Sequence, residues 1–159
     1  IGNSRKALSM ATLAKAIRIA ATAHENQFDK GGAPYVLHPL RLMMALQGED
    51  EKIVAVLHDV IEDCPDQWNF SKLRAEGFSE AVLEALAHVT KRPEEKDDYD
   101  AFVRRAARNP IARKVKLADL EDNMDLKRIS NPTAKDFERI AKYHRAWLML
   151  NAAQEGKPL

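Results

Sequence analysis

Four of the seven residues at positions 57–63, Leu-His-Asp-Val-Ile-Glu-Asp, can bind a metal ion or transfer a proton. They follow an apolar run that is typical of a buried helix. On a helix, Glu62 lies one turn beyond His58, and Asp63 lies one turn beyond Asp59. A cation would offset the cost of placing several ionisable groups beside a core segment. An exposed helix end with solvated acids accounts for this stretch equally well.

A metal ion would need further ligands, and the best candidates are His38 and Asp119. His38 opens a helix after a glycine-rich loop, and Asp119 is the acid in an otherwise apolar stretch. A surface histidine and a solvated helical aspartate are the alternative interpretations. Two histidines and two carboxylates suit Mn²⁺, Fe²⁺, Co²⁺ or Zn²⁺ about equally, because no thiolate favours zinc. Such a site leaves coordination positions for water and substrate, which is typical of catalysis.

The composition indicates one soluble globular domain. The chain has 159 residues, of which 45% are hydrophobic and 31% charged, and its net charge of +1 gives no reason to expect nucleic acid or a membrane as a partner. Cys64 is the single cysteine, which favours a reducing, cytoplasmic location. No membrane-spanning run or secretory signal is visible. Met10 is a candidate initiator, so residues 1–9 form an N-terminal segment that need not be native, and residues 10–159 form the domain.

Apolar residues recur at helical spacing along almost the whole chain, and no convincing strand pattern is present. We therefore predict a compact all-α bundle of about six to eight helices. The loops are expected at 28–35, which contains two glycines and a proline, and at 90–98, a charged and solvated segment that contains Pro93. The predicted helices cover residues 8–24, 38–46, 49–63, 70–77, 79–89, 99–108, 110–124 and 133–148.

The order His38, His58-Asp59, Asp119 resembles the signature of HD-domain metal-dependent phosphohydrolases. The likeness is closer to the hydrolase domain of the RelA/SpoT alarmone enzymes, and it extends from the first helix to Tyr143. The chain looks like a stand-alone small alarmone hydrolase of the metazoan SpoT homologue type, with no synthetase or regulatory domain. The segments that carry the resemblance are 30–39, 58–63, 77–91 and 115–124.

The resemblance implies a role for each matching residue. His38, His58, Asp59 and Asp119 would bind one divalent ion, usually Mn²⁺ in this family. Glu62 and Asp63 match the acidic pair that activates or orients the attacking water. The residues expected at the substrate are Lys30, Tyr35, Asn123, Arg139 and Tyr143.

One departure from the family pattern precedes Asn123. A basic or aromatic residue often stands just before this asparagine in the family, and Glu121-Asp122 stands here. We expect the two acids to make the local field more negative. Without the resemblance, Arg139 would be assigned to a surface ion pair, for instance with Asp136, and Tyr143 to the edge of the core.

The implied reaction is hydrolysis of the 3′-diphosphate of guanosine tetra- or pentaphosphate (ppGpp or pppGpp) to GDP or GTP and pyrophosphate. The HD fold hosts several phosphohydrolases, so a nucleoside 5′-phosphate or the 2′-phosphate of NADPH is an alternative substrate. A nucleotide-binding module without catalysis is a third possibility. The oligomeric state is not indicated by the sequence.

Overall fold

The computed structural model describes residues 10–159, and every regular element in this range is helical. A single isolated bridge joins Phe28 to Pro34. Nine segments of this range are α-helices, eight of them six residues or longer, and the predicted all-α fold is confirmed. The α-helices are α1 (Leu13–Ala23), α2 (Leu37–Ala45), α3 (Glu49–Leu57), α4 (Val60–Asp63), α5 (Phe70–Ala75), α6 (Glu80–Val89), α7 (Tyr99–Ala107), α8 (Pro110–Asn123) and α9 (Ala134–Gln154), and the 3₁₀ turns are η1 (Pro93–Glu95) and η2 (Leu126–Arg128).

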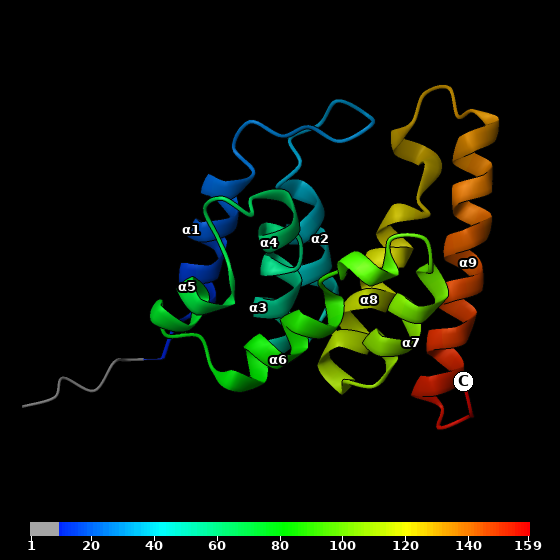
Figure 1. Cartoon of the computed structure of the whole chain (residues 1–159). Helices are drawn as coiled ribbons and strands as arrows, with labels where there is room; N and C mark the ends of the chain where they lie inside the picture. Colours follow the sequence, from blue (N-terminus) through cyan, green and yellow to red (C-terminus); the bar gives the residue numbers. More distant parts are fainter. Residues whose placement is uncertain (1–9) are drawn as a thin grey trace, which may run out of the picture.

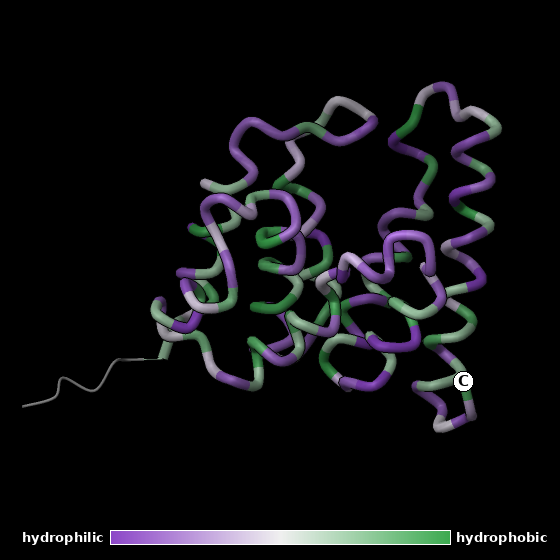
Figure 2. Tube along the Cα trace, in the orientation of Figure 1, coloured by the Kyte–Doolittle hydropathy of each residue, from purple (hydrophilic) through white to green (hydrophobic). Residues whose placement is uncertain are grey.

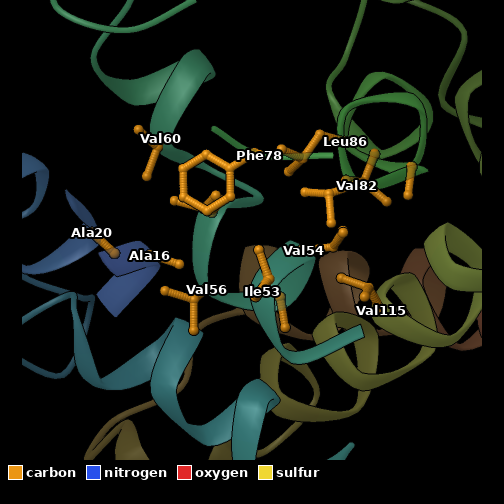
Figure 3. Close-up of a cluster of buried hydrophobic side chains, with 14 of the residues drawn as sticks. Ala16, Ala20, Ile53, Val54, Val56, Val60, Phe78, Val82, Leu86 and Val115 are labelled. Carbon is orange, nitrogen blue, oxygen red and sulfur yellow. The ribbon is translucent and has the colours of Figure 1, made fainter. Parts of the chain in front are cut away.

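The helix α3 forms the centre of the bundle, with α1, α2, α6 and α8 packed around it (Figure 1). All five residues from Ile53 to Leu57 are buried, as expected of a helix that is covered on every side. Figure 3 shows Val54 and Val56 among side chains from other helices, including Ala16 of α1 and Val82 of α6. The apolar run before His58 therefore fastens the end of α3 in the core.

A second apolar cluster joins α7, α8 and α9, and α8 contributes to both clusters. Val115 of α8 packs in the main core, whereas Leu120 packs in the second cluster. The helix α9 alternates between hydrophilic and hydrophobic positions, because only one of its faces is covered (Figure 2). The other buried members of the second cluster are Val103, Ala107, Ala146 and Leu150.

The helix predicted over residues 49–63 is interrupted at His58 and Asp59, which separate α3 from α4. The ring nitrogen Nδ1 of His58 lies 2.7 Å from the carbonyl oxygen of Ala55. In an uninterrupted α-helix the amide of Asp59 would donate to that same oxygen. Competition from the side chain for this carbonyl is a local physical reason for the break between the two helices.

Residues 90–98, predicted as a solvated loop, contain η1 and are anchored by a buried ion pair. Glu95 is 6% exposed and Arg105 of α7 is 8% exposed. Nε of Arg105 donates to Glu95 Oε1 at 2.6 Å, and Nη2 donates to Oε2 at 2.7 Å. The charge in this segment therefore serves an internal contact as well as hydration.

No helix within residues 10–159 is long and apolar enough to cross a membrane. The assignment of residues 10–159 to a single domain stays a prediction. Residues 1–9, including the start of the helix predicted from Leu8, lie outside the described part of the chain. The described helix α1 begins after Thr12, whose side chain accepts a hydrogen bond from the amide of Lys15.

The Glu95–Arg105 pair predicts a specific acid sensitivity of the fold. The hydrogen bonds from Arg105 lower the pKa of Glu95 from 4.5 to about 2. Because the folded-state pKa is depressed, the stabilisation is present above pH 4.5 and is lost as the pH falls towards 2. Glu95→Gln should lower the free energy of unfolding at pH 7 by about 3 kcal/mol. Urea denaturation at several pH values measures the free energy of unfolding. The difference in this free energy between wild type and variant should shrink as the pH falls from 4.5 to 2. A difference that does not change with pH would contradict this assignment.

Candidate metal centre and adjoining cleft

Three buried side chains from separate helices converge on one point. His38 is the second residue of α2, His58 follows the end of α3, and Asp119 belongs to α8. One ligand atom of each lies within 4.8 Å of the others. Asp119 Oδ1 lies 3.1 Å from His38 Nε2 and 3.7 Å from His58 Nε2. These side chains are 4–6% exposed, so they cannot be solvated surface groups.

Asp59 adds a second carboxylate to this group. Its Oδ2 lies 2.9 Å from His58 Nε2 and 4.0 Å from His38 Nε2. The hydroxyl of Tyr35 donates a hydrogen bond to the same Oδ2. The structure therefore brings together all four residues that the sequence singled out as metal ligands.

The hydrogen bonds of the two histidines leave their Nε2 atoms available to a metal. His58 Nδ1 lies beside the carbonyl of Ala55, which can only accept, so Nδ1 carries the proton. His38 Nδ1 lies 2.6 Å from Oδ2 of Asp122, which orients this ring in the same way. The buried Nε2 atom of His58 makes no well-directed hydrogen bond, although Oδ2 of Asp59 lies 2.9 Å from it. A buried ring nitrogen whose near neighbours are carboxylate oxygens fits a divalent ion, and His38, His58 and Asp119 form a possible site for one.

Lys116 and Asn123 complete the surroundings of Asp119 on α8. Lys116 Nζ lies 2.8 Å from Asp119 Oδ2, and Asn123 Nδ2 donates to Oδ1 at 2.7 Å. Although burial acts in the opposite direction, Lys116 and the two histidines hold the pKa of Asp119 well below its usual value. Lys116 was not predicted as a site residue. Its position three residues before Asp119 was the available signal, since that spacing places both on one helical face.

Asp122, expected to make the local field more negative, is neutralised by two arginines. Arg41 donates to its two oxygens at 2.7 and 2.9 Å, and Arg128 Nη1 donates to Oδ1 at 3.2 Å. Burial alone would raise the pKa of Asp122, but the contacts with His38 and Arg41 lower it. Its charge serves to orient His38, which the sequence analysis missed. Glu121 accepts a hydrogen bond from the indole nitrogen of Trp147.

The acidic pair lies next to the metal ligands. A small cavity of about 40 Å³ is lined by Glu62 together with His58, Asp59 and Asp119, among others. The backbone amide of Lys91 donates a hydrogen bond to Glu62 Oε1. Partial burial raises the pKa of Glu62, and the Lys91 amide opposes this change.

Asp63 lies on the side of the site that faces α1. Its Oδ2 is 3.8 Å from Nδ1 of His24, a buried residue at the end of α1. Burial, together with the charges of Asp59 and Glu62, raises the pKa of Asp63 to about 6. A carboxyl group in this range can exchange a proton near neutral pH.

A larger cleft of about 270 Å³ adjoins the metal ligands. Its walls come from the loop between α1 and α2, from the end of α8 and the segment that joins it to α9, and from α9. Phe28 and Ile129 add apolar surface to these walls. All five residues that the resemblance assigns to the substrate line this cleft: Lys30, Tyr35, Asn123, Arg139 and Tyr143. The roles of these residues and of the metal ligands stay predictions.

Asp136 holds two of the cleft's cations in place. Arg139 Nη2 donates to Asp136 Oδ1 at 2.8 Å, and Lys30 Nζ lies 3.8 Å from the same oxygen. The surface ion pair considered for Arg139 is therefore present, although Arg139 also faces the cleft. Asp136 was missed as a site residue. Its spacing from Thr133 is that of a capping box, which α9 indeed begins with.

The two walls of the cleft meet at Gly31. A Cβ atom on this residue would overlap the carbonyl oxygen of Arg128. Arg128 also lies 4.0 Å from Asp29, whose Oδ1 accepts hydrogen bonds from the amides of Gly31 and Ala33. The loop between α1 and α2 and the connection between α8 and α9 reach the same end of the molecule (Figure 1).

Comparison of the sequence with known proteins finds relatives among alarmone hydrolases. No protein-family model matches the chain. A guanosine-3′,5′-bis(diphosphate) 3′-pyrophosphohydrolase of Aquifex aeolicus is 28% identical over 160 residues, which cover 89% of this chain and 23% of that protein. A protein of the same name from Haemophilus influenzae is 39% identical over 77 residues, or 46% of this chain and 11% of that protein.

A third relative is the bifunctional (p)ppGpp synthase/hydrolase SpoT of Escherichia coli K12, which is 28% identical over 122 residues, 70% of this chain and 17% of that protein. The chain thus spans less than a quarter of the length of these relatives. Among solved structures, a metazoan ortholog of SpoT, described as hydrolysing ppGpp and acting in starvation responses, has a TM-score of 0.73 at 23% identity. That match covers 88% of this chain and 85% of the solved one, so the two share a fold. The predicted resemblance to SpoT-type hydrolases is confirmed.

The contact between His38 and Asp122 predicts an indirect effect on metal affinity. Asp122→Asn keeps the size of the side chain but weakens its hold on the His38 ring. Because residues that orient a ligand typically contribute 10–100-fold, Mn²⁺ affinity should fall by about that factor in calorimetric titrations. Asp66→Asn, at an exposed position, serves as the matched control. Equal affinity in the two variants would contradict the orienting role.

Proposed function

We propose that this protein hydrolyses the 3′-diphosphate of ppGpp and pppGpp, releasing pyrophosphate and GDP or GTP. The observation that carries the proposal is the convergence of His38, His58 and Asp119, with Asp59 Oδ2 2.9 Å from His58 Nε2. His58, Asp59 and Asp119 also line a small cavity together with Glu62. The relatives named for this reaction support the same substrate. The proposal concerns the chain described here, which is much shorter than those relatives.

The adjoining cleft suits a polyanionic nucleotide. Lys30 and Arg139 supply positive charge at its walls, and the arginine can bind two phosphate oxygens at once. Tyr35 and Tyr143 supply aromatic surface in the same cleft. Because Asp136 already contacts both cations, it restrains them before the substrate arrives. Such preorganisation lowers the entropic cost of binding.

The chemistry requires a nucleophile, charge neutralisation and proton transfer. A bound divalent ion supplies Lewis acidity and lowers the pKa of a water molecule. We assign Glu62 to accept the proton of the attacking water. The water oxygen attacks the phosphorus that is linked to the 3′-oxygen. The bond between this phosphorus and the 3′-oxygen breaks. The 3′-oxygen then takes up a proton, and the proton that Glu62 accepted from the water balances this step. We assign Asp63 to share in activating or orienting the water.

We propose Mn²⁺ as the ion at this site. Two imidazole nitrogens and two carboxylates provide borderline and hard ligands, and no cysteine lies among them to favour zinc. Iron, cobalt and zinc share these preferences, so activity should be compared across the four ions. The histidine nitrogens distinguish the site from the all-oxygen sites that magnesium and calcium prefer.

The first test is product identification with wild-type protein. Incubation of the Mn²⁺-loaded protein with ppGpp should yield GDP and pyrophosphate in equal amounts, separated by ion-exchange chromatography. A parallel panel with nucleoside 5′-phosphates and NADPH should release little phosphate. If orthophosphate is released preferentially from a nucleoside 5′-phosphate or from NADPH, that nucleotide replaces ppGpp as the proposed substrate. Tight binding of ppGpp with no product after long incubation would instead indicate a nucleotide-binding module.

The second test separates the metal ligands from the acidic pair. Asp59→Ala should abolish both Mn²⁺ binding and turnover, because it removes a ligand. Glu62→Ala should retain Mn²⁺ but lower kcat by about 10²–10⁴-fold, since only proton transfer is lost. Arg74→Ala, an exposed residue paired with Glu80, serves as the control. Full activity in Asp59→Ala would overturn the proposed mechanism.

A further inference from the structure

Arg105 makes more contacts than an ion pair requires. Beyond the two oxygens of Glu95, its Nη2 donates to the carbonyl of Thr90 at 2.8 Å, and its Nη1 donates to the carbonyl of Ala87. One buried guanidinium thus binds the end of α6, the residue after it and η1. These contacts fix the chain on both sides of residues 91–94.

The peptide group between Thr90 and Lys91 connects this arrangement to the acidic pair. Its carbonyl accepts from Arg105, and its N–H donates to Glu62 Oε1. A trans peptide is planar, so its carbonyl and N–H point in opposite directions. When Arg105 holds the carbonyl on one side, it directs the N–H towards Glu62 on the other. A cation at the carbonyl also polarises the peptide and makes the N–H a stronger donor.

We propose that Arg105 is a positioning residue, which fixes the Glu62 carboxylate beside the metal ligands through the Thr90–Lys91 peptide. Its effect on the reaction rests on the proposed hydrolase function, whereas its effect on the peptide does not. Glu95 has a supporting part, because it holds the guanidinium and also accepts the amide of Arg92 at 3.0 Å.

Stabilisation of the fold alone is a weaker account of this arrangement. A buried ion pair adds little net stability compared with apolar residues of similar volume, so packing could anchor the loop equally well. Apolar side chains could not bind a carbonyl and so could not set the direction of one peptide plane. The contacts to Ala87 and Thr90 cap carbonyls at the end of α6, and the contact to Thr90 in addition sets the direction of the peptide that faces Glu62.

Arg105→Lys is the informative variant, because it keeps the charge but cannot reach both oxygens of Glu95 and two carbonyls at once. We expect kcat for ppGpp to fall by about 10-fold or more, because the base that transfers the proton is misdirected. KM and Mn²⁺ affinity should stay within about two-fold, since the cleft and the metal ligands are untouched. Leu73→Ala, a core truncation in α5, serves as a destabilised control with normal kcat.

A double-mutant cycle tests whether Arg105 acts through Glu62. In the Glu62→Ala background, Arg105→Lys should leave the residual kcat unchanged, because the group it positions is gone. An equal loss of kcat in both backgrounds would overturn the proposal. A loss of kcat in Arg105→Lys that is no larger than the loss in Leu73→Ala would also overturn the proposal.

The Lys91 amide provides a readout that does not depend on activity. In ¹⁵N-labelled protein, its hydrogen exchange should be slow in wild type and about 10-fold faster in Arg105→Lys. Glu95→Gln, the variant to use if Arg105→Lys does not fold, should give a smaller acceleration, because the Thr90 contact remains. Unchanged exchange in the variant measured would overturn the proposal. If hydrogen exchange at the Lys91 amide follows this expectation but the wild-type protein does not hydrolyse ppGpp, only the proposed function is contradicted.

Discussion

The arrangement of this protein depends on the cost of burying charged groups in a small volume. His38, His58 and Asp119 are almost inaccessible to water, so each polar atom needs a partner inside the protein. The outward atoms have one: Ala55 for His58, Asp122 for His38, and Lys116 for Asp119. The atoms that face one another are carboxylate oxygens and ring nitrogens 2.9–3.7 Å apart, and His58 Nε2 among them makes no well-directed hydrogen bond. This crowding of ligand atoms marks the place where a divalent ion fits.

The helix α8 connects the site to both apolar clusters of the fold. Its first half packs in the main core and Leu120 packs in the second cluster, so the helix cannot shift without disturbing both. Asp119 and Asn123 project from this rigid element towards the site. Residues that must converge with sub-ångström accuracy are thus carried by the part of the chain with the most packing on either side.

Hydrophobic spacing and short motifs allowed much of this to be predicted, and the limits have physical reasons. Helical periodicity is local, so the helices were found, and a motif links His58 to Asp59 directly. The break after Leu57 was missed, because a side chain competing for one carbonyl leaves no trace in the hydrophobic pattern. Asp122 and Arg105 were missed because their partners lie far along the chain or on main-chain atoms. His38 and Asp119 were candidates by residue type and position, but only the resemblance joined them to His58 and Asp59 as one ligand set, since no spacing rule links them.

The absence of a side chain at Gly31 has a consequence for the range of molecules that the cleft can admit. The main chain of Gly31 lies so close to the carbonyl oxygen of Arg128 that no Cβ atom fits between them. Any other amino acid would act as a wedge and would widen the entrance. The width of the cleft at this end therefore depends on a missing methyl group.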